Sequence, residues 1–137
     1  MFAEVIAAGL AFACTPTHVW DGDGPIWCAE GPKIRLSGIA AREMDGSCKK
    51  GHPCPAADPI RARDYLVRLI GKPVGRAPTG HILVSGETLV CRSAGSGKGD
   101  RTAAWCSNST AGDLSTAMAR SGFAARWDRY WTGRGSQ

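Results

Sequence analysis

The sequence predicts a mainly β fold with two or three short helices, folded as one domain. Its 137 residues are enough for one domain with a modest core and too few for two. The 18 glycines, the 8 prolines and the short apolar runs favour many turns and short strands over a helical bundle. A composition of 43% hydrophobic and 21% charged residues is ordinary for a soluble globular protein.

Three strands are expected early in the chain, over residues 12–20, 25–29 and 33–39. The acidic turn 21–24 separates the first two and predicts a hairpin. The third strand carries apolar residues on one face and Arg35 on the other. An arginine at such a position either projects towards an anion or lies solvated along the surface.

Two helices have clear boundary signals. Asp58 can cap the first, Pro59 suits its first position, and Gly71 followed by Pro73 ends it. The charged residues expected on its solvent face are Arg61, Arg63, Asp64 and Arg68. The second helix is predicted over residues 113–121, with Gly122 at its C-terminal end.

Later strands are expected over residues 81–84, 88–92 and 102–106, with a linker at 72–80 and a loop at 93–100. The Gly/Ser-rich part of that loop has glycine where a nucleotide-binding P-loop requires Ser or Thr after the lysine. We therefore exclude a P-loop.

Six cysteines in so short a chain indicate disulfides, because their number is even and no CxxC pair occurs. A bridge between Cys48 and Cys54 would close a loop, and Cys91 and Cys106 are expected opposite each other in a hairpin. This leaves Cys14 with Cys28, although six cysteines allow about 15 pairings. The alternative, a metal site at Cys48, His52 and Cys54, lacks a fourth ligand. Disulfides imply an oxidising compartment, so we expect a periplasmic or secreted protein.

The predicted domain covers residues 14–127. Residues 1–13 form either an apolar leader, as the remnant of a signal peptide, or the start of the first strand. The tail 128–137 is basic and aromatic, and we expect Trp127 and Trp131 to pack back over the domain rather than to stack on bases. No stretch is long enough to span a membrane, and a monomer is expected.

Acidic and basic groups suited to a phosphodiester lie between residues 21 and 43. Asp21, Asp23 and Glu43 flank Arg35, and neighbouring strands can bring them to one point. A guanidinium is a permanently charged, bidentate donor to phosphate oxygens. The net charge of +5 and the pI of about 9.1 suit a polyanionic partner such as nucleic acid.

Four motifs, in this order and spacing, resemble the thermonuclease family, the staphylococcal-nuclease-like domains. They are VWDGD at 19–23, IRLSGI at 34–39 running on to Glu43, GDRTAAWC at 99–106, and Asp113-Leu114 with Met118 and Gly122. The resemblance covers most of the chain. It implies an OB-type five-stranded β-barrel with small helices and Ca²⁺-dependent hydrolysis of DNA and RNA.

The resemblance also implies residue roles. Asp23 would ligate the metal, with Asp21 orienting it through water and the Ala41 backbone carbonyl as a further ligand. Glu43 would be the general base that activates water. Arg35 and Arg101 would bind the phosphate and stabilise its transition state.

The sequence departs from the family pattern at three positions. Ala40 replaces a metal-ligating aspartate, Arg42 replaces a proline, and Asp100 replaces a glycine. Since Ca²⁺ prefers six to eight oxygen ligands, Ala40 predicts weakened calcium binding or another divalent cation, with Asp45 or Asp21 as possible substitutes.

Two functions follow from these residues. The favoured one is a metal-dependent endonuclease that hydrolyses phosphodiester bonds. The alternative is a catalytically impaired barrel that binds nucleic acid or another anionic partner. A third, blander option is a disulfide-stapled barrel with a protein partner, and the three histidines are expected to be structural or at the surface.

Overall fold

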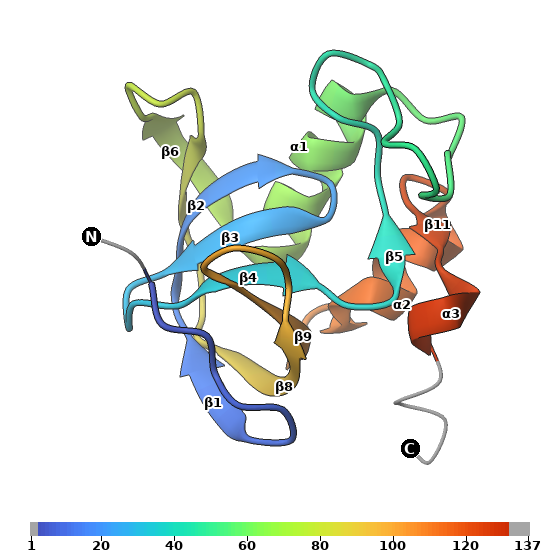
Figure 1. The fold of residues 1–137 in the computed structure, drawn as a ribbon. Helices are drawn as coiled ribbons and strands as arrows, with labels where there is room; N and C mark the ends of the chain where they lie inside the picture. The colour runs from blue at the N-terminus through green and yellow to red at the C-terminus, as the bar shows by residue number, and fades with distance from the viewer. Residues whose placement is uncertain (1–2, 132–137) are drawn as a thin grey trace.

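The computed structural model describes residues 3–131, and within them the chain forms a mainly β domain with three helices (Figure 1). The helices are α1 (Pro59–Ile70), α2 (Leu114–Ser121) and α3 (Asp128–Trp131). The strands are β1 (Ala11–Cys14), β2 (Pro16–Asp21), β3 (Gly24–Cys28), β4 (Lys33–Leu36), β5 (Ile39–Ala40), β6 (Lys72–Arg76), β7 (Ile82–Ser85), β8 (Leu89–Ser96), β9 (Arg101–Asn108), β10 (Gly112–Asp113) and β11 (Ala125–Arg126).

One large mixed sheet has the strand order β1-β8-β9-β4-β3-β2-β7-β6, with β10 paired to β9, while β5 and β11 form a separate ribbon. The closed five-stranded barrel implied by the family resemblance is therefore wrong. Pairing continues beyond five strands because β1 adds to β8 and β6 adds to β7, which leaves β1 and β6 at the two ends of the order.

The strand expected at 12–20 is divided into β1 and β2, because its two parts pair with different neighbours, β8 and β3. The linker expected at 72–80 is wrong over its first half, where β6 pairs with β7. This strand is exposed along its whole length and contains Pro73 and an irregularity near Gly75. It therefore lacks the alternating pattern that identifies a half-buried strand.

Helix α1 begins and ends where its capping residues predict. The Asp58 side chain accepts a hydrogen bond from the Arg61 N–H at 3.0 Å, and the Gly71 N–H donates to the Val67 carbonyl. Arg63, however, is buried, contrary to the expected solvent face. It lies three and seven residues before Leu66 and Ile70, so the helical period places it in the buried stripe.

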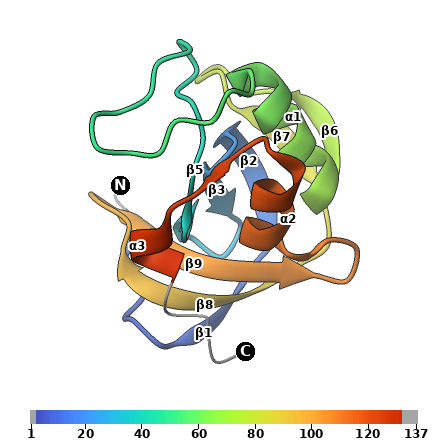
Figure 2. The ribbon, with the colours of Figure 1, turned by 90° about the vertical axis from the view of Figure 1, so that its right-hand side faces the viewer.

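The core lies between the sheet and helices α1 and α2, which pack side by side (Figure 2). Large side chains from both layers are fully buried there: Val19, Ile26, Ile34, Leu36, Leu66, Ile70, Leu89, Leu114 and Met118. The apolar face expected for β4 is thus confirmed, with Arg35 on the opposite face. Within residues 3–131, the helices are all too short or too polar to cross a membrane.

Three disulfides link the expected partners: Cys14–Cys28, Cys48–Cys54 and Cys91–Cys106. Cys91 and Cys106 are directly opposite in the β8–β9 register, as the hairpin predicts. The bridges are compatible with an oxidising environment.

Both ends of the described chain are held against this sheet. The backbone N–H groups of Ala3 and Ile6 donate to Asp100 and Thr102, and β1 starts at Ala11, so the last residues of the expected leader belong to the first strand. Trp131 packs edge-on against Trp105, as expected, while residues 132–137 of the tail lie outside the described residues.

Candidate active site

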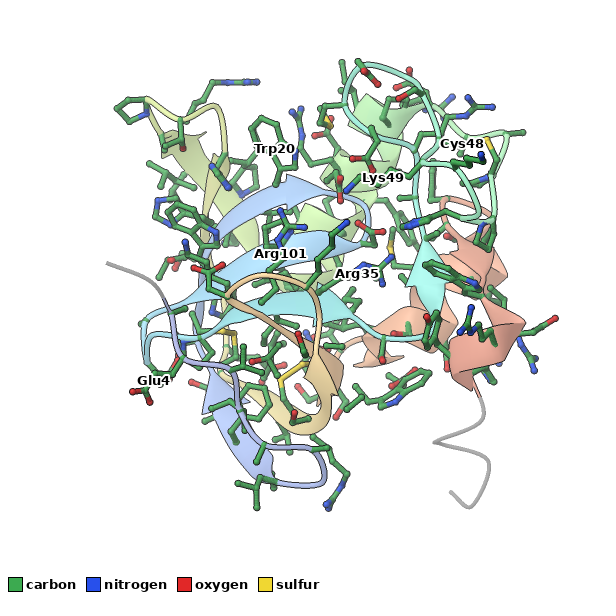
Figure 3. The ribbon with its side chains drawn as sticks, viewed as in Figure 1. Glu4, Trp20, Arg35, Cys48, Lys49 and Arg101 are labelled. Carbon is green, nitrogen blue, oxygen red and sulfur yellow. A yellow bond between two sulfur atoms is a disulfide. The ribbon has the colours of Figure 1, made fainter. Side chains whose placement is uncertain are left out.

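Arg35 and Arg101, for which the family resemblance predicts phosphate binding, come from adjacent parallel strands. The register of β4 and β9 pairs Lys33 with Arg101 and Arg35 with Ala103. Side chains two residues apart on a strand share a face, so Arg35 and Arg101 project from the same side. Figure 3 shows both reaching towards one region, with Lys49 on the loop above them.

The acidic turn between β2 and β3 is held tightly against its neighbours. A Cβ on Gly22 would lie 2.9 Å from the Ala62 Cβ of α1 and 3.0 Å from the Ala41 Cβ, so only glycine allows this close approach. The Leu36 N–H donates to the Asp23 carbonyl at 2.9 Å. Asp23 is thereby fixed beside the end of β4.

The Asp23 carboxylate faces the chain's own donors. Its Oδ2 atom accepts a hydrogen bond from Arg35 Nη2 at 3.2 Å and one from the Ala41 N–H at 3.3 Å. The Asp23 N–H in turn donates to Asp21 Oδ1 at 3.1 Å. Asp21 and Asp23 are both buried.

Burial, together with the nearby negative charges of Asp23 and Glu43, raises the pKa of Asp21 to about 10. This shift favours the protonated form of Asp21 at neutral pH. Clustered carboxylates with a strongly shifted pKa occur often at functional sites.

A small cavity of about 60 Å³ brings the predicted groups together. Asp21, Asp23, Arg35, Glu43 and Arg101 all line it. They come from the β2–β3 turn, from β4, from the loop after β5 and from β9. The expectation that these distant residues meet at one place agrees with this geometry.

The loop between β5 and α1 adds two groups, Lys49 and His52, to the same cavity. Lys49 Nζ lies 3.8 Å from Glu43 Oε1. The His52 ring lies against Trp127, with 4.3 Å between ring centroids. Partial burial and the positive charges of Arg35 and Lys49 lower the pKa of His52, which favours its neutral form.

A larger cavity of about 420 Å³ adjoins the first and shares Arg35, Lys49, His52 and Arg101 with it. Aromatic side chains form part of its wall: Trp105, Trp127 and Tyr130. The backbone N–H of Trp127 donates to the Gly38 carbonyl at 2.7 Å, which holds this residue in place. The arrangement places flat apolar surfaces next to a cluster of cations.

The donors present fall short of the calcium site that the resemblance implies. Asp23 already has Arg35 as its partner at one oxygen, and Ala41 turns its N–H towards Asp23. Ala40 is buried in β5, opposite Ala125 of β11. Within residues 3–131, no three His, Cys, Asp or Glu side chains are grouped closely enough to hold a metal ion.

Asp45, expected as a substitute metal ligand, and the two other departures from the family pattern, Arg42 and Asp100, each contact residues outside the metal position. Asp45 is exposed and accepts hydrogen bonds from Ser47. Arg42 donates to the Pro55 and Gly46 carbonyls at 2.7 and 2.8 Å, so it braces the loop. Asp100 forms an ion pair with Lys33 at 3.3 Å.

Lys49 and His52 were not identified from the sequence as site residues, and His52 was expected to be structural or at the surface. The sequence could have indicated both residues, because they lie within the short Cys48–Cys54 disulfide ring that follows Glu43. A disulfide ring of that size holds its residues near the chain segment that precedes it. Only the fold, however, shows that the ring faces the cavity.

Comparison of the chain with protein-family models, with curated proteins and with solved structures found no match.

Proposed function

We propose that the protein hydrolyses phosphodiester bonds in single-stranded nucleic acid. The observation that carries this proposal is the convergence of Arg35, Arg101 and Glu43 on one small cavity beside a larger aromatic one. Guanidiniums can stabilise the charge that develops on phosphate oxygens, and a carboxylate can accept a proton from the attacking water, so this set of groups suits in-line hydrolysis of a phosphodiester.

The roles follow from the chemistry of each group. Arg35 and Arg101 bind the non-bridging oxygens of the phosphate and stabilise the charge that develops on them. Glu43 takes a proton from a water molecule, whose oxygen then forms a bond to phosphorus. The bond from phosphorus to the leaving oxygen breaks, and that oxygen takes up a proton from water.

The adjoining cavity suits the rest of a nucleotide. Its volume of about 420 Å³ lies within the range of small-molecule sites. Trp127 and Tyr130 line this cavity. Stacking of a base on such an aromatic side chain is worth about 1–3 kcal/mol. A splayed single strand reaches such a wall more easily than a stacked duplex does, so we propose single-stranded DNA or RNA as substrate.

The setting proposed for this activity is the periplasm or the outside of the cell, with the protein acting as a monomer. Three disulfides suit that setting. The calcium dependence implied by the family resemblance is not carried over, because the donor set falls short of such a site.

The test is cleavage of a fluorescent single-stranded oligonucleotide by the oxidised protein and by Glu43→Gln. We expect the wild type to cleave and Glu43→Gln to lose at least about 100-fold in kcat/KM, the scale of general base catalysis. Glu4→Gln, the same substitution at an exposed position, is the matched control. Full activity in Glu43→Gln would remove Glu43 from the mechanism.

A second candidate function is binding of nucleic acid without cleavage. It is favoured by Ala40, which removes a carboxylate at the position where the family carries a metal ligand. It predicts oligonucleotide binding that weakens steeply with salt and no cleavage under any condition. The same oligonucleotide, measured by anisotropy and by gel, distinguishes the two functions.

A further inference from the structure

Two carboxylates of the small cavity, those of Asp23 and Glu43, each lie close to a positive side chain of the protein itself. Arg35 Nη2 lies 3.2 Å from Asp23 Oδ2, and Lys49 Nζ lies 3.8 Å from Glu43 Oε1. Arg101 lines the same space. The positive charge that a phosphate requires is therefore already built into this chain.

Lys49 lies on a loop that a disulfide and several hydrogen bonds hold in place. The Cys48–Cys54 bridge closes a ring around it, and the Glu43 N–H donates to the Ser47 carbonyl at 2.8 Å. The His52 N–H donates to the Lys49 carbonyl at 3.0 Å, and the His52 ring rests on Trp127. These contacts keep the base of the Lys49 side chain beside Glu43 although its end is half exposed.

We infer that Lys49 supplies the positive charge that a divalent cation would otherwise supply beside Glu43, so that this site handles its anion without a metal. An ammonium group offers a compact charge and three donors to phosphate oxygens. The cavity of about 60 Å³ holds the cationic groups of Arg35, Lys49 and Arg101 beside its carboxylates. A divalent cation would have to displace Arg35 from Asp23 and Lys49 from Glu43, since both carboxylates already have a positive partner.

The role assigned to Lys49 in hydrolysis rests on the proposed function, whereas its effect on metal binding does not. The chain offers a matched pair for separating these questions. Lys49 lines both cavities, while its neighbour Lys50 is exposed on the same loop and lies outside both linings. Replacing either by glutamate changes the net charge equally, but only the change at Lys49 adds a carboxylate beside Glu43.

The test compares wild type, Lys49→Glu and Lys50→Glu in two measurements, with thermal unfolding as the check that all three fold. In isothermal titration with CaCl₂, Lys49→Glu is expected to bind Ca²⁺ at least about 10-fold more tightly than the other two proteins, since an added carboxylate favours this oxygen-seeking cation. In the cleavage assay, wild type and Lys50→Glu are expected to keep their activity in excess EDTA, and Lys49→Glu to lose at least about 10-fold.

Three results would overturn the inference: loss of wild-type cleavage in EDTA, calcium binding by wild type as tight as by Lys49→Glu, or identical behaviour of the two variants. If none of the proteins cleaves with or without metal, the proposed function fails. The calcium titrations then still decide whether Lys49 occupies the place of the cation.

Discussion

Replacing Asp21 by asparagine is expected to stabilise the protein at neutral and alkaline pH. The Asp21 side chain is buried beside Asp23, and its Oδ1 accepts the Asp23 N–H at 3.1 Å. Asparagine has the same shape and keeps an acceptor oxygen at that position, but it never becomes charged. The substitution therefore removes the cost of burying a titratable carboxyl group while preserving its hydrogen bond.

The size of the effect follows from the pKa of Asp21, which burial and the negative charges of Asp23 and Glu43 together raise from 3.8 to about 10. A group with a raised pKa in the folded state contributes stability that is complete below its unfolded pKa and is lost as pH rises through the folded pKa. Each pH unit in this window corresponds to about 1.4 kcal/mol. At pH 7 the free energy of unfolding of the wild type is thus up to about 4 kcal/mol lower than that of Asp21→Asn. The difference between the two proteins widens until about pH 10.

The assay is urea unfolding of both proteins between pH 4 and pH 9, with the free energy of unfolding compared at each pH. Asp45→Asn is the control, because hydrogen bonds from Ser47 lower the pKa of that exposed carboxyl. The effect of Asp45→Asn has the opposite sign. The ionised Asp45 carboxylate stabilises the fold above its unfolded pKa, so Asp45→Asn is expected to lower the free energy of unfolding slightly at neutral pH. A free-energy gap for Asp21→Asn that stays constant with pH, or that shrinks as pH rises, would refute the reasoning.

Two further predictions concern the walls of the larger cavity and the loop above it. Trp127→Ala is expected to weaken binding of a single-stranded oligonucleotide about 5- to 150-fold by loss of stacking, without changing the salt dependence. Arg101→Ala should lower the slope of log K against log salt by about 1. Fluorescence anisotropy at several salt concentrations measures both, and an altered slope for Trp127→Ala would contradict the stacking role. The double variant Cys48→Ser/Cys54→Ser is expected to lose about 2 kcal/mol of unfolding free energy, since closing a ring of that size lowers the entropy of the unfolded chain by a corresponding amount. It is also expected to bind the oligonucleotide more weakly, because Lys49 and His52 are no longer held in place. Urea unfolding and the same anisotropy titration test both effects, and an unchanged affinity would show that the ring does not support the site.

The sequence by itself determined the features that depend on neighbouring residues. Asp58 and Gly71 set the ends of α1 because capping involves atoms within one turn. Alternation along β4 set the face of Arg35 because strand side chains repeat every two residues. The pairing of Cys91 with Cys106 followed from a single hairpin register.

Only the tertiary structure decided the features that depend on which distant segments meet. The sheet extends beyond five strands because β1 pairs with β8, far along the chain, and because the exposed β6 adds to β7. The sequence of β1 does not identify its distant partner. The helical period places Arg63 in the apolar stripe of α1, but only the packing of the domain against that stripe shows that this charged side chain is buried. The β5–α1 loop folds over the parallel β4–β9 pair. This long-range placement brings Lys49 and His52 of the loop into the cavity that Arg35, Glu43 and Arg101 also line.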